Sequence, residues 1–196
     1  MRALLTLLLV ALPAGIASAG NTLIPPAVPV AVAKSALTVK PAREWNKMGA
    51  RPGRSSETWT LDGDTLNDLT FYGGIENDKP LFREVNHHDK PLPHFASTML
   101  LTDIPALLEN SYRLALDTSL IRIGKAAPAM LAGRKAIHFE YDFTRQHEEV
   151  RRRGEGWATI VSGKLYMITF EAPDIYYFDA GIADARKVAE SATLPG

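Results

Sequence analysis

The sequence contains no cysteine. This absence excludes disulfide bonds, metal sites built on thiolates, cysteine nucleophiles and an N-terminal cysteine that carries a lipid anchor. Packing and hydrogen bonding must therefore hold the fold together, and a chain of this length can bury a core large enough to do so.

The sequence also lacks an excess of charge of either sign. The 196 residues include 22 Lys plus Arg and 22 Asp plus Glu, so the formal net charge at pH 7 is zero. We therefore expect no broad basic surface and no nucleic-acid partner. With 46% apolar and 22% charged residues, 14 Gly and 13 Pro, the composition is typical of one globular domain plus some irregular length.

A catalytic signature is the third feature that the sequence lacks. It has no P-loop, no Gly-x-Ser-x-Gly, no His-Glu-x-x-His and no EF-hand pattern. Gly154 and Gly156 form only the first half of a dinucleotide-binding fingerprint, and they precede a predicted strand instead of following one. We therefore predict a protein that is not an enzyme and that needs no cofactor.

Residues 1–19 are predicted to be a secretory signal peptide. Arg2 supplies a positive charge, Ala3 to Leu12 form an apolar run, and Ala17-Ser18-Ala19 places small residues before the cleavage site. The apolar run is far shorter than the roughly 20 residues that span a bilayer. The mature protein is expected to be soluble, without a membrane anchor, and periplasmic or secreted.

Residues 20–35 are predicted to be an extended tether, because three closely spaced prolines do not fit the interior of a sheet. The alternative is an edge strand over 28–32, since an edge tolerates Pro29. The folded domain is then expected to cover 36–196.

The first half of this domain is predicted to contain three short strands, over 36–39, 58–61 and 69–72. Their short connections are typical of an antiparallel meander. Residues 76–94 are predicted to be a polar loop, because Asp and Pro interrupt them throughout.

Two helices are predicted from apolar stripes. Residues of the first stripe recur at i, i+3, i+4, i+7, i+8 and i+11 from Ile104 to Ala115, with Asp103 as N-cap and a proline in the first turn. The second stripe extends from Phe178 to Ala192, and Asp174 is placed to cap that helix.

Residues 137–144 alternate between apolar and polar side chains, which predicts a strand, and 150–161 are predicted to return along it. A turn centred between Gln146 and His147 brings opposite charges together, whereas a later turn puts Glu140 opposite Glu155. The predicted register pairs His138 with Glu155, Glu140 with Arg153 and Asp142 with Arg151.

The other predicted strands complete the domain. Residues 120–123 are compatible with a strand, Gly133 marks a turn, and Ser162-Gly163 joins 157–161 to 164–170 as a hairpin. This element order predicts an α+β fold, an antiparallel sheet covered by helices in a single domain.

Several segments resemble the PsbP-like family. They are the Trp45 segment, Gly133 before an aromatic strand, Gly163-Lys164-Leu165-Tyr166, Ala172-Pro173, and the final helix that ends in Ala189-Glu190-Ser191. The resemblance covers roughly residues 36–194. It implies an α/β/α sandwich with a scaffold or binding role in an extracytoplasmic compartment. The chain lacks the cysteine of lipoprotein members, and no histidine matches the metal ligands of photosynthetic members.

One loop concentrates possible metal ligands, namely Glu84, His87, His88 and His94. Glu84 and His87 have the Glu-x-x-His spacing of di-iron bundles, which places both side chains on one helix face. Because prolines bracket this loop, we predict a solvated polar loop with no metal. The alternative is a metal- or small-molecule-dependent enzyme that uses His87 and His88.

Arg151, Arg152 and Arg153 form the one basic run and are the predicted partner-binding residues, since guanidinium groups bind phosphates and carboxylates. Neighbouring glutamates reduce the local positive potential of this run. Strand alternation puts Arg152 on the same side as Tyr141, where we expect it to stack or to reach a sheet edge.

His138 shares a strand face with Glu140 and Asp142 and could act as a base. We predict a charged, open surface instead, because a working base needs a cleft. The aromatic residues Trp45, Trp59, Trp157 and 176–178 are predicted to be core contacts and not a ligand pocket.

We therefore expect an exported, soluble and monomeric protein that binds or supports the assembly of a partner. The partner would be an envelope protein or a small ligand. The predicted contact surface is the 76–94 loop together with residues 95–103.

Overall fold

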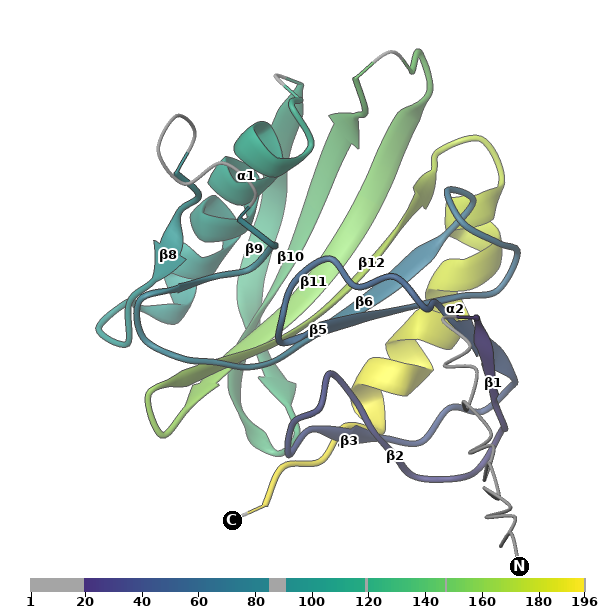
Figure 1. Cartoon of the computed structure of the whole chain (residues 1–196), viewed down its shortest axis with the longest axis horizontal. Helices are drawn as coiled ribbons and strands as arrows, with labels where there is room; N and C mark the ends of the chain where they lie inside the picture. Colours follow the sequence, from purple (N-terminus) through teal and green to yellow (C-terminus); the bar gives the residue numbers. More distant parts are fainter. Residues whose placement is uncertain (1–19, 85–90, 119, 147, 196) are drawn as a thin grey trace, which may run out of the picture.

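An eight-stranded antiparallel sheet separates two helices, one on each face (Figure 1). The structure, a computed structural model, describes residues 20–84, 91–118, 120–146 and 148–195. In spatial order the strands are β1 (Thr22–Ile24), β4 (Trp45–Lys47), β5 (Ser56–Thr60), β6 (Asp68–Ile75), β12 (Lys164–Pro173), β11 (Arg151–Val161), β10 (Arg134–Thr144) and β9 (Ile121–Leu131). This arrangement confirms the predicted α+β fold.

The remaining elements are short strand pairs and the helices. Strand β2 (Val30–Ala31) pairs with β3 (Thr38–Val39), and β7 (Lys79–Pro80) pairs with β8 (His94–Phe95). A 3₁₀ turn, Leu101–Asp103, leads into α1 (Ile104–Ala115), and α2 (Tyr177–Glu190) follows β12.

Each face of the sheet has its own apolar core. Strand β12 contributes to both cores, because alternate residues point to opposite faces. Ile168, Phe170 and Ala172 pack toward α2, with Trp59 and Phe178. The α1 face is built in the same way from other strand residues and from the buried stripe of α1. Its buried members include Leu165, Met167, Phe139, Phe143, Leu107 and Leu108.

Both helices lie where their stripes predict, and Asp103 occupies the N-cap position of α1 as predicted, but Asp174 does not cap α2. The carboxylate of Asp103 accepts the Leu100 amide at 2.8 Å, so it closes the 3₁₀ turn and makes no cap hydrogen bond to α1. Asp174 lies before the N-cap of α2, which is Tyr176, and it pairs with Arg153 at 3.2 Å.

The segment 20–35 is not a tether, which corrects the sequence prediction. Strand β1 pairs with β4, strand β2 pairs with β3, and Val32 and Ala33 are fully buried. The prolines lie between the paired residues, so they do not interrupt a ladder. The apolar side chains of this segment complete the α2-face core. The alternative of an edge strand over 28–32 is nearer to the structure.

The predicted meander also needs correction. Strand β3 pairs with β2 in a separate small sheet. Strand β4 takes its place in the meander by pairing with β5, which pairs with β6. The 76–94 loop contains β7 and the first residue of β8, so it is partly a hairpin. The strand predicted over 120–123 extends as β9 to Leu131. Pro128 is accommodated because β9 is an edge strand.

The predicted register of β10 and β11 is wrong. The structure pairs Glu140 with Glu155 and Asp142 with Arg153. The opposite strand face decides this, because Gly154 lies across from Tyr141 and Gly156 across from Phe139. A Cβ atom on Gly154 would lie 2.2 Å from the Tyr141 ring, and one on Gly156 would lie 2.4 Å from the Phe139 ring. Ring packing on the α1 face therefore outweighs charge pairing on the other face.

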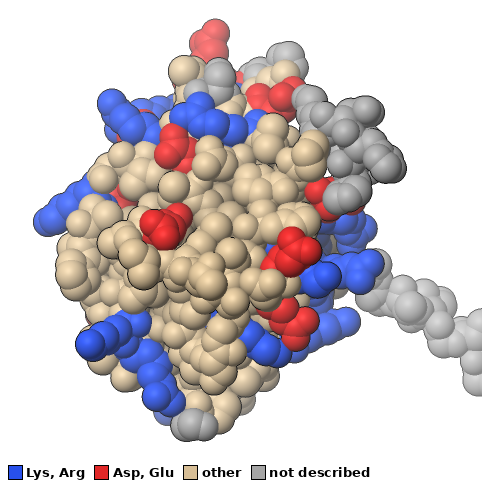
Figure 2. Space-filling model, turned by 90° about the vertical axis from the view of Figure 1, so that its left-hand side faces the viewer, with Lys and Arg blue, Asp and Glu red and all other residues tan. Residues whose placement is uncertain are grey.

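The predicted signal peptide, residues 1–19, lies outside the described residues. Within the part of the chain that the structure describes, no helix is long and apolar enough to cross a membrane. On the face drawn in Figure 2, basic and acidic side chains are interspersed around uncharged surface. That face therefore carries no broad basic patch.

Candidate ligand-binding cavity

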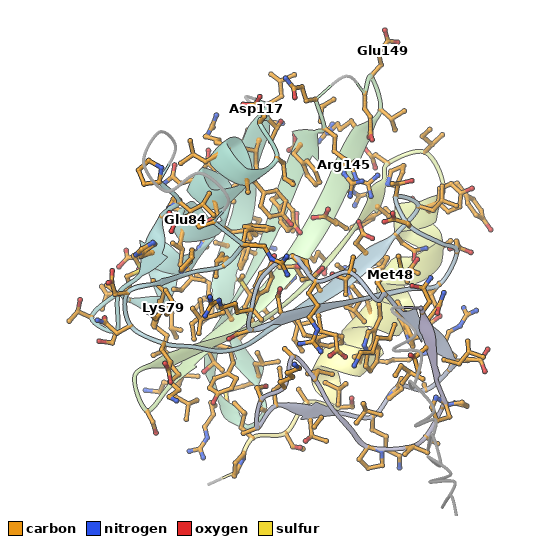
Figure 3. All side chains as sticks on the ribbon, in the orientation of Figure 1. Met48, Lys79, Glu84, Asp117, Arg145 and Glu149 are labelled. Atoms are coloured by element: carbon orange, nitrogen blue, oxygen red, sulfur yellow. The ribbon has the colours of Figure 1, made fainter. Side chains whose placement is uncertain are left out.

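A cavity of about 430 Å³ opens on the α1 face of the sheet. Its floor comes from β5, β6 and β12, one wall from the C-terminal half of α1, and the rim from the segments around 48–52 and 82–83. Met48 and Arg145, both labelled in Figure 3, are among its lining residues. The other lining residues used below are Arg51, Thr58, Asp64, Asp68, Thr70, Tyr72, Phe82, Arg83, Tyr112, Ala115 and Glu171.

Two carboxylates lie side by side on the cavity floor. Asp68 of β6 is the register partner of Glu171 of β12, and the two residues are only 9% and 5% exposed. Arg145 donates to Asp68 Oδ2 at 2.8 Å and its Nη2 lies 3.6 Å from Glu171 Oε1. Arg152 Nη2 lies 3.8 Å from Asp68 Oδ2. Buried like charges are thus compensated by two guanidinium groups.

Tyrosine hydroxyls hold the second carboxylate in place. Tyr112 and Tyr141 both donate to Glu171 Oε2, at 2.6 and 3.0 Å. Burial raises the pKa of both phenols well above the usual value, and the charge of Glu171 raises it further. Both side chains therefore remain protonated donors at any physiological pH.

The pKa of the other carboxylate, Asp68, departs from its ordinary value. Burial first, and then repulsion from Glu171, raises the pKa of Asp68 from 3.8 to about 6, although Arg145 and Arg152 act in the opposite direction. The carboxylate pair therefore still carries an electrostatic penalty that a bound cation would reduce.

Aromatic rings form the apolar side of the cavity. Phe82 contacts Tyr112 edge to face, with ring centroids 5.5 Å apart, and contacts Tyr72 at 6.1 Å. The neighbouring Arg83 amide donates to the Pro52 carbonyl at 2.7 Å, which ties the two rim segments together. A Cβ on Gly53 would lie 2.3 Å from the Leu81 carbonyl oxygen, so glycine is required where these segments meet.

Polar atoms remain available around the floor. The hydroxyls of Thr58 and Thr70 bond to each other at 2.9 Å. The Nε atom of Arg145 is buried and has no hydrogen-bond partner among the described residues. An unpaired buried donor is costly unless another group satisfies it.

The predicted metal ligands are brought together only in part. His94 Nε2 lies 3.8 Å from Glu84 Oε2, and its Nδ1 lies 2.9 Å from Asp78 Oδ1. His87 and His88 lie outside the described residues. Among the residues that are described, no group of three or more His, Asp or Glu is arranged to hold a metal ion.

The basic run does not form one patch. Arg151 pairs with Asp142 at 3.4 Å, and Arg153 lies over the Phe178 ring and pairs with acidic residues beside α2. Arg152 is 1% exposed, lies over the Phe143 ring and donates to the Thr65 carbonyl at 2.7 Å. The expected stacking of Arg152 is confirmed, but its burial excludes direct contact with a partner.

His138 lies in a groove, which corrects the expectation of an open surface. The groove, about 340 Å³, lies between β9, β10, β11 and the end of α2. His138 packs on Trp157 with ring centroids 5.2 Å apart and bonds Glu155 at 3.1 Å. Arg186 also binds Glu155, through Nε and Nη2. Burial opposes ionisation of Glu155, but the two partners outweigh it and lower its pKa.

Sequence reasoning missed the residues of the cavity. Trp45 and Trp59 are core residues as predicted, and Trp157 packs partly buried against the same core but also lines the groove. A signal for the cavity existed, because Glu171 interrupts a strand that is otherwise almost entirely uncharged and buried. Such a residue needs buried partners, but the sequence does not say which.

No protein-family model matches the chain, and no curated protein matches it by sequence. Among solved structures, it is similar to cyanobacterial PsbP (CyanoP) from Synechocystis sp. PCC 6803. That match has 14% identity and a TM-score of 0.53, and it covers 94% of this chain and 98% of that one. A second match is LpqN, involved in cell envelope biogenesis of Mycobacterium tuberculosis, with 11% identity, a TM-score of 0.35, and coverage of 90% and 85%.

The similarity to CyanoP extends over almost the whole of both chains, and the layers agree with the α/β/α sandwich that the sequence resemblance implies. The chain therefore has a PsbP-like fold.

Proposed function

We propose that this chain is an exported, non-enzymatic binding protein that holds a small organic molecule in the cavity beneath α1. The observation that carries the proposal is the cavity floor, where Asp68, Glu171 and Arg145 are held in fixed positions below an aromatic wall. A concave apolar site with a few positioned polar groups is the usual form of a small-molecule site.

Binding is better supported than catalysis. The described residues that line the cavity include no Ser, Cys, His or Lys. The two carboxylates already accept hydrogen bonds from Arg145 and from two tyrosines. Groups held in this way are fixed in position, which suits the orientation of a bound ligand. Export is supported by the signal-like pattern of residues 1–19.

The proposed site also includes part of the surface that the sequence predicts. Phe82 and Arg83 belong to the 76–94 loop and form the rim. The loop would thus act by shaping the cavity as well as by contacting a partner.

A pair of tryptophan variants tests the proposal. Ala115→Trp places a large ring on the cavity wall, whereas Leu114→Trp places the same ring on the exposed side of α1, outside the lining. Ligands found by a thermal-shift and NMR screen of small organic molecules should bind wild type and Leu114→Trp alike, and Ala115→Trp at least about tenfold more weakly. A screen without hits, or hits that bind both variants equally, contradicts the proposal.

The alternative from the sequence is a metal-dependent enzyme, and the proximity of Glu84 and His94 is the observation in its favour. Titration with Zn²⁺ separates the two functions. Stoichiometric Zn²⁺ binding that is lost in His94→Ala would favour the alternative, while binding that is weak and unchanged by the substitution would leave the cavity as the site.

A further inference from the structure

The two ends of the cavity are lined by residues of opposite charge. Asp64, Asp68 and Glu171 line one end, where Arg145 is the only cation among the lining residues that the structure describes. Arg51 and Arg83 line the other end. Arg145 and the buried Arg152 compensate Asp68 and Glu171, so the exposed Asp64 gives this end its excess negative charge. Arg51 and Arg83 give the other end an excess of positive charge.

Strand geometry gives the distance between the two ends. Asp68 and Tyr72 belong to the same strand, and Tyr72 is the register partner of Ser56. The rim segment lies at that level, because the Gly53 amide donates to Ser56 Oγ at 2.5 Å. Four residues of strand at about 3.3 Å each separate the two levels by about 13 Å of backbone.

The two ends differ in how far their charges are already neutralised. Arg51 lies 3.7 Å from Glu57, which Lys47 contacts more closely at 2.9 Å. Arg83 is exposed and has no ion pair with any residue that the structure describes. A guanidinium in this position favours a carboxylate, which it can bind through two hydrogen bonds.

The acidic end favours a cation. Asp68 and Glu171 lie side by side, and only one oxygen of each accepts a hydrogen bond of ordinary length among the described residues. The other oxygens can accept from an ammonium group, and the nearby rings of Tyr72 and Tyr112 favour positive charge as well.

We propose, building on the small-molecule function above, that the ligand is a zwitterion of dipeptide to tripeptide length, with its ammonium group at Asp68 and Glu171 and its carboxylate at Arg83. Two or three extended residues span about 7 to 11 Å, and the side chains at the two ends bridge the remainder. An apolar side chain of the ligand packs on Phe82 and Tyr72.

Three forms of one dipeptide test this proposal by calorimetry. The probes are Leu-Ala with free termini, N-acetyl-Leu-Ala and Leu-Ala amide. The free form should bind, and blocking either terminus should weaken binding at least about tenfold, because each block removes a charge-assisted contact. Equal binding of all three forms, or no binding of the free form, overturns the assignment.

Variants then assign each terminus to its end of the cavity. Arg83→Gln should weaken the free dipeptide to the level of the amide and abolish the difference between these two. Glu171→Gln should weaken the free dipeptide to the level of the N-acetyl form and abolish the difference between these two. Asp64→Asn replaces it as the test variant if Glu171→Gln does not fold. Lys79→Gln, an exposed residue outside the lining, is the matched control and should change nothing. The opposite assignment of termini, or no effect of these variants, contradicts the proposal.

The outcome also separates this inference from the proposed function. If the dipeptides do not bind but another small molecule binds in a way that Ala115→Trp abolishes, the binding function stands and the zwitterion fails. If no small molecule depends on Ala115, both fail.

Discussion

The two faces of the sheet are covered by helices of similar length but are filled differently. On the α2 face, the helix and the N-terminal segment close a continuous apolar core that includes Trp45 and Trp59. On the α1 face, the helix packs on β9 and on parts of β6, β10 and β12, and a cavity remains between the C-terminal half of the helix, the rim segments and the strands β5, β6 and β12. The difference shows that one sheet can combine a continuously packed face with a face that leaves a cavity.

Buried charged groups occur on both faces: Glu57 and Glu155 are buried on the α2 face, and Asp68 and Glu171 on the α1 face. Thr58, Thr70 and Glu171 occur in strands whose other faces supply the α2 core. Such residues cost stability compared with a well-packed apolar surface.

The largest expected effect tests whether the α2 face carries most of the stability. Trp59→Ala should lower the free energy of unfolding by about 3 to 5 kcal/mol, because it empties a fully buried site. Phe82→Ala, at the cavity rim, should cost about 1 to 2 kcal/mol, since this ring already borders an opening. Urea denaturation measures both values, and equal losses would contradict the comparison.

The second prediction concerns pH and the α1 face. The folded-state pKa of Asp68 is about 6, above the ordinary value of 3.8. Between these values the folded state binds the extra proton, so this residue's contribution to stability falls as pH rises, by about 1.4 kcal/mol per pH unit at most. The stability of wild type relative to Asp68→Asn should therefore decrease from about pH 4 to about pH 7.

Denaturation at several pH values gives that difference curve, and a flat curve would contradict the prediction. Glu76 provides a control of opposite sign. Its hydrogen bond and ion pair with Lys164 lower its pKa, so its contribution is present at neutral pH and is lost as pH falls. The stability of wild type relative to Glu76→Gln should therefore decrease as pH falls.

The third prediction tests how the α1 face sets the strand register. Gly156→Ala should cost about 1 to 3 kcal/mol, because the new methyl group meets the Phe139 ring. Phe139→Leu in the same chain should recover part of the loss. Gly124→Ala is the control, since its Cβ would make an ordinary contact at 3.5 Å. If both alanine variants have the same stability, packing does not set the register.

The smallest expected effect is at the edge of the α2 face. Arg186→Ala leaves the buried Glu155 with His138 as its remaining partner, and should cost about 1 kcal/mol. Lys187→Ala removes an exposed contact to Asp184 and should cost about 0 to 0.5 kcal/mol. Thermal unfolding of the two variants compares them, and the reverse order would show that Glu155 does not need this partner.

The prediction of secondary structure was most successful where signals are local. The Ser162-Gly163 turn joins β11 and β12 as expected, with both residues at positive φ, and the α1 stripe is buried from Ile104 to Tyr112. The prediction failed where strand pairing was inferred from the residues of one strand face alone. The charges of 138–142 favoured one register, whereas the aromatic rings on the other face required another.

The sequence by itself determined the fold class, the helices and the hairpin turns, because periodicity and turn chemistry act between residues that are close in the chain. Tertiary structure alone decided the register of β10 and β11, the packing of residues 20–35, and the meeting of Asp68, Arg145 and Glu171 in one cavity. These depend on contacts between distant segments, where complementary shape and the burial of charge select one arrangement among several that the local pattern allows.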